Sequence, residues 1–435
     1  SLWADYRKKN GVDEPVASAK PAKPPELETL LKVPGALGAL AEWIDAGATL
    51  RQPMLALGAS LAFFSAVLGQ KVRTASNLRS NLYVLGIAGS GRGKERARES
   101  IKQLATFLGI TDVLGGSFGS GSSIEAAIER NPVRFFMPDE IGHLLGTMNS
   151  RNAESYLRDI VPVLLSMYTS SASSFQRREL ASGESGTVEQ PSLSFYGTTV
   201  PDNFYPNLTK ELFSNGLLGR CLVFEAPAGV PPLQRVESAA PSDRLLEVCG
   251  FWVKAPTNAD PNAGNIEKHT VPAPLVVPTT EGAMRAIDSA HDIFLARVAA
   301  GVSDGEQALF SRLRATAWKL ALIRACGIDT NPQITEDDAQ WGKDLAWRLT
   351  EDLAARAGGG APENKVEEES QRVLAIIRKA GPDGISRKEL VGKCRFIRGK
   401  ELTDVCGTLQ EAGDIVADQQ KTDAGRVKTT YRVVV

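Results

Sequence analysis

The stretch Tyr83-Val-Leu-Gly-Ile-Ala-Gly-Ser-Gly-Arg-Gly-Lys-Glu-Arg-Ala-Arg98 decides the fold that we expect for this chain. An apolar run from Leu82 to Ile87 predicts a buried strand, a glycine-rich turn leads to Lys94, and a helical pattern follows. Strand, glycine loop, lysine and helix is the order of a phosphate-binding P-loop. Glycines let successive backbone N–H groups point at phosphate oxygens, the helix N-terminus adds positive charge, and the lysine reaches the β- and γ-phosphates.

The match to G-x-x-x-x-G-K-[ST] is incomplete at both ends, because Ala88 and Glu95 stand at the first and last positions. Glu95 replaces a hydroxyl that normally ligates Mg²⁺, so it either holds the ion through a carboxylate oxygen or a water, or leaves metal binding weak. The alternative is a glycine-rich strand-to-helix turn that binds no nucleotide. The expected phosphate-binding residues are Gly89, Ser90, Gly91, Arg92, Gly93, Lys94, Glu95 and Arg96.

An acidic pair follows a second apolar strand, Val133-Arg-Phe-Phe-Met-Pro-Asp-Glu140. This is the Walker B pattern: Asp139 would hold Mg²⁺ and Glu140 would polarise the attacking water. The sequence thus predicts Asp139 and Glu95 as metal ligands. A strand that merely ends in two solvated acids is the alternative.

Two further features are typical of nucleotide hydrolysis. The strand Ser192–Thr199 ends in hydroxyls, and we expect Thr198 or Thr199 to orient the attacking water. Arg220 follows Gly219 and precedes the predicted strand 221–225, which predicts an arginine finger that reaches a neighbouring subunit's γ-phosphate. A structural arginine paired with a carboxylate is the alternative. The expected catalytic residues are Lys94, Asp139, Glu140, Thr198, Thr199 and Arg220.

Residues 175–180 and 187–189 are expected to form a hairpin that carries the basic pair Arg177 and Arg178. In ring-shaped ATPases a hairpin at this place in the chain projects into the central pore. A solvated loop with two arginines is the alternative.

Composition bounds the remaining possibilities. The chain has 435 residues, of which 43% are hydrophobic, and a net charge of −1, so only local patches could attract nucleic acid. The five cysteines are scattered without a C-x-x-C pair, which indicates a reducing, cytoplasmic compartment and argues against a zinc site or a disulfide framework. We expect no signal peptide, and we expect the apolar segment Pro53–Leu68 to be a buried helix rather than a membrane span.

Composition shifts divide the chain. The tail is rich in Lys and Pro and starts at Ser1 rather than Met, which suggests the downstream part of a longer protein; a trimmed or processed chain is the alternative. We expect a linker at 1–29, a helical segment at 30–80, an ATPase core at 81–227, an irregular segment and helical bundle at 228–358, a linker at 359–369 and a small domain at 370–435. Within these parts we expect Ser122 or Ser123 to cap a helix that ends at Arg130, and one amphipathic helix at 310–326.

The small domain has the pattern of a winged helix, with three helices followed by two strands around a polar turn. The helices are expected at 370–379, after a Ser386–Glu389 capping box, and at 399–412, and the strands at 415–417 and 428–435. Basic residues gather before the third helix and at the wing, which suits phosphate contacts; a protein-binding winged helix is the alternative. The expected DNA-binding residues of this domain are Arg395, Arg398, Lys400, Arg426 and Lys428.

Taken in order, Gly93-Lys94-Glu95, the strand ending in Asp139-Glu140, P-S-L-S-F-Y-G-T-T and D-N-F followed by G-L-L-G-R-C-L-V-F resemble the P-loop ATPase domain of phage and mobile-element primase-helicases. That family is akin to the virulence-associated E helicases. The resemblance covers roughly residues 30–355. It implies an α/β fold with a RecA/AAA+-like P-loop NTPase core, helical flanks, and a hexameric ring that hydrolyses ATP with Mg²⁺ and moves on DNA. It also implies an upstream primase domain.

Two hypotheses follow. The first is an ATP-driven, ring-forming helicase that translocates on single-stranded or forked DNA during phage or mobile-element replication and has no membrane partner. The second is a nucleotide-switched DNA-binding replication initiator or loader without unwinding activity, which the departure at Glu95 favours.

Overall fold

The computed structural model describes residues 23–148, 155–177, 186–208, 212–213, 215–236, 239–257, 271–357, 365–394, 397, 399–421 and 427–433.

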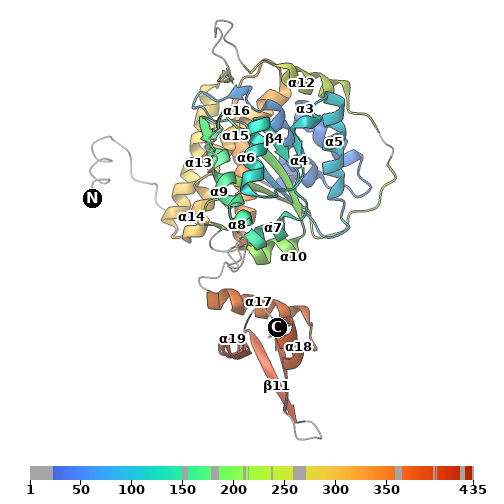
Figure 1. Cartoon of the computed structure of the whole chain (residues 1–435), viewed down its shortest axis with the longest axis vertical. Helices are drawn as coiled ribbons and strands as arrows, with labels where there is room; N and C mark the ends of the chain where they lie inside the picture. Colours follow the sequence, from blue (N-terminus) through green and yellow to red (C-terminus); the bar gives the residue numbers. More distant parts are fainter. Residues whose placement is uncertain are drawn as a thin grey trace, which may run out of the picture.

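A five-stranded parallel sheet lies at the centre of the larger part of the chain (Figure 1). Its strands follow one another across the sheet as β3 (Leu114–Gly115), β4 (Val133–Phe136), β7 (Ser192–Thr199), β2 (Tyr83–Ile87) and β8 (Cys221–Glu225). Because all neighbours run parallel, the carboxyl ends of the strands meet at one edge. The prediction of an α/β core is confirmed.

The helix α4 (Pro53–Leu68) covers one face of this sheet and is buried from Met54 to Leu68. Its sequence is apolar on all sides, as expected for a helix enclosed by other elements. Gly58 lets α4 approach β8, since a Cβ there would lie 2.8 Å from the Phe224 ring. The prediction of a buried helix is confirmed, and no helix of the described residues is long and apolar enough to cross a membrane.

Helices α6, α7 and α9 pack on the strands β4 and β7. They cover the face opposite α4, because Tyr196 contacts Leu55 of α4 while Gly197, the next residue of the strand, faces Ile141 of α7. Their bounds are Gly121–Arg130, Ile141–Met148 and Ile160–Ser170.

A second group of helices continues the core beyond the sheet. It comprises α2 (Leu27–Leu30), α3 (Gly35–Ala46), α5 (Glu95–Leu108), α12 (Asp243–Lys254), α13 (Glu281–Ala299), α14 (Asp304–Phe310), α15 (Leu313–Ile328) and α16 (Glu336–Ala357). Of this group, α3, α5, α12 and α15 pack on α4. One hydrophobic core runs without interruption from Leu30 to Ala354. The predicted boundaries at residues 80 and 227 therefore do not separate cores. The predicted linker also ends early, since α2 packs on α16 and Trp341 Nε1 donates to the Leu30 carbonyl at 3.0 Å.

Several predicted elements need correction. Ser120, rather than Ser122 or Ser123, caps α6, because its side chain accepts from the Ser123 N–H. The single helix expected at 310–326 is two helices, α14 and α15, and α15 is buried almost all round rather than amphipathic.

The hairpin expected around residue 180 is present as β5 (Ser174–Gln176) and β6 (Thr187–Glu189). The parallel pair β1 (Val72–Arg73) and β9 (Leu275–Val276) was not predicted, because each strand has only two residues.

The C-terminal unit has its own hydrophobic core, which shares no residue with the larger one. Three helices precede an antiparallel ribbon, and the Ser386–Glu389 capping box is formed as predicted. A short strand that joins the ribbon, β10, was not predicted. The elements are α17 (Lys365–Lys379), β10 (Ile385–Ser386), α18 (Arg387–Lys393), α19 (Gly399–Glu411), β11 (Ile415–Lys421) and β12 (Val427–Val433).

Candidate nucleotide site

Three predicted segments meet at the carboxyl edge of the sheet. The glycine loop follows β2, the acidic pair follows β4, and β7 lies between these two strands. The Thr198 N–H donates to the Pro138 carbonyl at 3.0 Å, so the ladder between β4 and β7 continues up to the acidic pair. This edge is the usual place for ligands in open parallel sheets.

Two glycines of the loop have backbone conformations that other residues rarely adopt. Gly91 and Gly93 have φ angles of 67° and 82°, which favour glycine. A Cβ on Gly93 would also lie 2.8 Å from the Leu50 carbonyl. The Arg92 side chain turns out of the loop and donates to the Ala228 carbonyl, while Gln52 Nε2 donates to the Arg92 carbonyl at 2.9 Å. The loop is thus held from both flanks.

Lys94 is only 6% exposed and its Nζ pairs with Glu140 Oε1. Asn203 Nδ2 donates to the other Glu140 oxygen at 3.3 Å. Glu140 itself has a φ of 49°, a conformation that costs a non-glycine residue about 1 kcal/mol or more. The predicted lysine and the predicted general base therefore contact one another directly. Asn203 was missed, although it stands in the D-N-F motif.

Asp139 is held on both oxygens. Arg98 Nη1 lies 2.6 Å from Oδ2, and Thr198 Oγ1 donates to Oδ1 at 2.8 Å. Partial desolvation raises the pKa of Asp139, but the hydrogen bonds from Arg98 and Thr198 outweigh it, so the pKa lies below its ordinary value. Arg98 was not predicted as a site residue. Its signal is its spacing: four positions after Lys94, it lies on the same face of α5.

The structure distinguishes the two hydroxyls that end β7. Successive residues of a strand point to opposite faces, so only one of them can reach the acidic pair. Thr198 does so, whereas Thr199 Oγ1 is buried without a hydrogen-bond partner and would lie 2.5 Å from a Cβ on Gly142. Of the two predicted sensor residues, Thr198 belongs to the site and Thr199 packs behind it.

Two of the predicted phosphate-binding residues lie apart from the acidic pair. Glu95 is exposed in the first turn of α5, and no contact of the described residues joins it to Asp139. Its charge suits the helix N-terminus. Arg96 points away from the loop, with its guanidinium 5.9 Å from the Trp43 ring centre and against Gly47.

The oxygen donors of Asp139 and Glu140 are of the kind that Mg²⁺ prefers, and this ion is usually held by one or two carboxylates together with substrate phosphates. Within the described ranges no cluster of three or more His, Cys, Asp or Glu side chains could hold a metal alone. The residues therefore fit a Mg²⁺ ion that arrives with phosphates, provided that Arg98 releases Asp139 Oδ2.

Arg220 lies where the strands of the sheet begin, opposite the carboxyl edge at which Lys94 lies. It immediately precedes β8, whose first residue pairs with Tyr83, the first residue of β2. Its guanidinium lies 5.7 Å from the Tyr168 ring centre, and its Nη1 donates to the Gly216 carbonyl at 2.8 Å. The described part of the chain gives it no acidic partner, contrary to the alternative that we considered. Arg220 cannot reach the glycine loop of its own chain, so a role at a phosphate requires a neighbouring subunit.

The predicted DNA-binding residues are only partly described. Arg177 pairs with Glu129 Oε2 at 2.6 Å and is 19% exposed, so its side chain is held within the protein, which fits neither a grip on DNA nor the solvated loop that we considered as the alternative. Lys400 is exposed at the start of α19. Arg178, Arg395, Arg398 and Arg426 lie outside the described residues, as does the side chain of Lys428.

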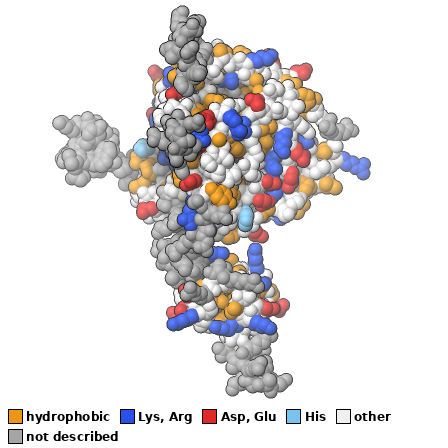
Figure 2. Space-filling view, viewed as in Figure 1, with side chains coloured by type: hydrophobic (Ala, Val, Ile, Leu, Met, Phe, Trp, Pro, Cys, Tyr) orange, Lys and Arg blue, Asp and Glu red, His pale blue; other side chains and the backbone are white. Residues whose placement is uncertain are grey.

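On the face seen in Figure 2, basic and acidic side chains are interspersed over the larger unit, while several basic side chains gather on the C-terminal unit. This distribution agrees with the net charge of −1, which leaves DNA attraction to local patches.

No model of a known protein family matches this chain, and no curated protein matches it.

Proposed function

We propose that this chain is an ATP-dependent, ring-forming DNA helicase that translocates on single-stranded DNA. One observation carries the proposal: Lys94, Asp139, Glu140 and Thr198 come from three separate segments and meet at the carboxyl edge of one parallel sheet. A lysine in a glycine loop beside two acids and a strand-end hydroxyl is the set that phosphoryl transfer to water needs.

Each residue has a role in this proposal. Lys94 and the N–H groups of the loop bind the phosphates, and Glu140 takes a proton from the attacking water. Lys94 must leave Glu140 to bind a phosphate, which frees the carboxylate at the moment when a base is needed. Bound Mg²⁺ would neutralise charge on the phosphates, with Asp139 as its protein ligand. Asn203 and Thr198 keep the two carboxylates in place.

Ring assembly and DNA binding are the parts of the proposal that rest on resemblance and on local charge. Arg220, distant from its own loop, would act on the γ-phosphate of a neighbouring subunit. The C-terminal unit, as a winged helix, would bind DNA or load the ring through Lys400 and its basic neighbours in sequence.

A second function is a replication initiator or loader that nucleotide binding switches without unwinding. The observation that favours it is the state of the acidic pair: Glu140 is paired with Lys94 and Asp139 with Arg98, and Glu95 stands apart from both acids. Slow hydrolysis would follow if binding did not break these pairs.

The test is ATP-dependent unwinding of a forked duplex by the chain, by Glu140→Gln and by Arg220→Ala, with ATPase rates measured with and without single-stranded DNA. A helicase unwinds, its ATPase rate rises several-fold with DNA, and both variants bind DNA without unwinding. ATP hydrolysis without unwinding would favour the loader. Failure to bind ATP would contradict both functions.

A further inference from the structure

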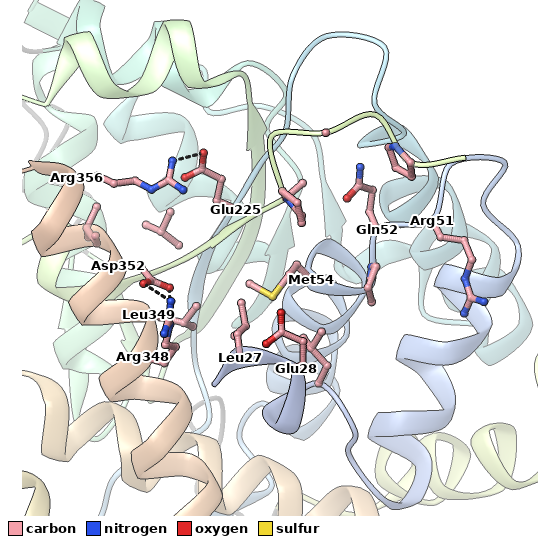
Figure 3. A pocket seen from close by; sticks show the side chains of 18 of the residues that line it. Leu27, Glu28, Arg51, Gln52, Met54, Glu225, Arg348, Leu349, Asp352 and Arg356 are labelled. Carbon is pink, nitrogen blue, oxygen red and sulfur yellow. Dashed lines mark hydrogen bonds and ion pairs between the residues drawn. The ribbon is translucent and has the colours of Figure 1, made fainter. Parts of the chain in front are cut away.

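A pocket of about 510 Å³ lies beside β8 at the carboxyl edge of the sheet. In Figure 3, side chains of α16 face those of α2 and the start of α4 across it. The residues that close it are largely apolar and come from four segments, namely Leu27 and Leu31, Met54, the stretch 226–231, and Leu349 with Leu353. Its size is typical of a small-molecule site.

This pocket shares a wall with the glycine loop. Gln52 lines the pocket and donates through Nε2 to the Arg92 carbonyl at 2.9 Å. Gly229 also lines it, and the Arg92 guanidinium lies against the carbonyls of Ala228 and Gly229. Glu225 at the pocket pairs in register with Ile87, two residues before the loop begins. Adjacent strands are about 4.8 Å apart, so the pocket begins one strand spacing from the loop.

We propose that this pocket holds the base and ribose of the nucleotide whose triphosphate lies on the glycine loop. The inference rests on the proposed nucleotide binding and adds to it where the nucleoside lies. Binding of a planar base is favoured by burial of its faces against apolar side chains, and Met54 and Leu349 provide such side chains on opposite sides of the pocket. The polar end of the same ligand then extends over Arg92 towards Lys94.

Most charged side chains of the pocket are already paired: two ion pairs lie within it, Arg51 pairs with Asp45 outside it at 2.7 Å, and among the described residues Glu28 alone has no partner. Arg356 Nη1 lies 2.6 Å from Glu225 Oε1, the Tyr205 hydroxyl donates to the other oxygen, and Arg348 lies 2.9 Å from Asp352. Apolar contact and shape would therefore dominate recognition of the base. A pocket of that kind discriminates weakly between bases of similar size. We expect ATP and GTP to bind within about tenfold of each other, and CTP more weakly because it buries less apolar area.

The test compares the dissociation constants of ATP and inorganic tripolyphosphate by calorimetry. Leu31 is half-buried at the pocket, so Leu31→Trp would fill it at modest cost to folding, and Leu295→Trp on the exposed side of α13 is the matched control. We expect Leu31→Trp to weaken ATP at least tenfold and to leave tripolyphosphate within twofold, with the control unchanged. Val230→Trp, at a residue of the pocket rim that is 69% exposed, repeats the test if Leu31→Trp unfolds.

Unchanged ATP affinity in both folded pocket variants would overturn the inference, as would a wild type that binds tripolyphosphate as tightly as ATP. Either result leaves phosphate binding at the loop intact. A wild type that binds neither ligand overturns the proposed function itself. Lys94→Ala separates these cases, because it should lose both ligands.

Discussion

At the scale of single residues, Arg98 is the cation that pairs with Asp139 before a ligand binds. Its guanidinium lies 2.6 Å from Asp139 Oδ2, one of the two carboxylate oxygens that could bind a metal ion. A motif search passes over this residue, because the P-loop pattern ends one position after Lys94. The competition between a side-chain cation and a metal ion becomes visible only when α5 and the end of β4 are placed together.

Removing this competitor should make metal binding easier. We expect Arg98→Gln to lower the Mg²⁺ concentration needed for half-maximal ATP binding by about two- to fivefold, since partly exposed ion pairs contribute about 0.2–1 kcal/mol. Titration of Mg²⁺ against a fluorescent ATP analogue would measure this shift. Arg98→Lys, which keeps the charge, is the control. A higher Mg²⁺ requirement in Arg98→Gln would mean that Arg98 organises the site rather than competing for it.

Lys319 is a buried cation of a different kind. It is 2% exposed, donates to the carbonyl and Oδ1 of Asn81 at 2.8 and 2.7 Å, and lies 3.8 Å from the Tyr168 ring centre. No acidic partner for it occurs in the described ranges. Burial, with the charges of Arg220 and Arg312, holds the pKa of Lys319 well below its ordinary value.

Stability should therefore rise with pH through this group. In the unfolded chain Lys319 keeps its proton up to about pH 10, whereas the folded protein releases it earlier, so the unfolded state binds more protons. We expect the unfolding free energy of the wild type relative to Lys319→Met to increase between pH 7.5 and 9.5, by at most about 1.4 kcal/mol per pH unit. Urea titrations at each pH would measure it. A constant difference would show that Lys319 stays charged when folded.

At the scale of elements, the sequence predicts strands better than it predicts helix packing. Strands β2, β4, β7 and β8 begin within a residue of their expected positions, because each is a short apolar run bounded by turn residues. Helix α15 was expected to be amphipathic, yet tertiary contacts with α3, α4 and α16 bury it almost all round. The ion pair between Lys94 and Glu140 likewise depends on the order of the strands in the sheet, and no local sequence pattern predicts that order.

The contact between α7 and β7 positions the acidic pair, and Gly142 permits it. A Cβ at Gly142 would lie 2.5 Å from Thr199 Oγ1 and 2.7 Å from the Asn203 carbonyl. We expect Gly142→Ala to cost about 1–3 kcal/mol of stability and to lower ATPase activity, because it displaces Glu140 and Asn203 together. Thermal melts and ATPase rates would measure both effects.

Gly250 in α12 is the matched control, since nothing lies within 4 Å of a Cβ there. Gly250→Ala should stabilise the protein by about 0.5–1 kcal/mol, as expected for alanine inside a helix, and should leave ATPase activity unchanged. Equal effects of the two substitutions would contradict the role given to the contact between α7 and β7.

At the scale of the whole molecule, the chain forms two hydrophobic cores, whose described residues lie within 30–354 and 373–431. An ion pair between the two units, Lys379 Nζ with Asp202 Oδ2 at 3.7 Å, joins two exposed side chains and contributes little to stability. The break between them was predicted as a linker at 359–369, but α17 begins within that range at Lys365. The single hydrophobic core of residues 30–354 was not predicted. Composition shows where a chain becomes polar, but it does not show which helices share a core.

Residues 23–357 should therefore fold without the C-terminal unit. We expect this shortened chain to keep its melting temperature within about 2 °C and its ATP affinity within twofold, because the pairs that cross between the cores are weak. Affinity for forked DNA should fall at least tenfold if the C-terminal unit contacts DNA. Differential scanning calorimetry and fluorescence anisotropy would measure these quantities. Loss of ATP binding on shortening would show that the two units depend on each other.

The hydrogen bond from Trp341 to Leu30 joins residues 311 positions apart, and this separation has a consequence for synthesis on the ribosome. Helix α4 emerges early and is apolar on every side, but α15, which completes the core around it, begins at Leu313, 245 residues after α4 ends at Leu68. At about 5–20 residues per second, the nascent chain carries this incompletely covered helix for tens of seconds. A chaperone that binds apolar segments as they leave the exit tunnel would protect the chain during that interval.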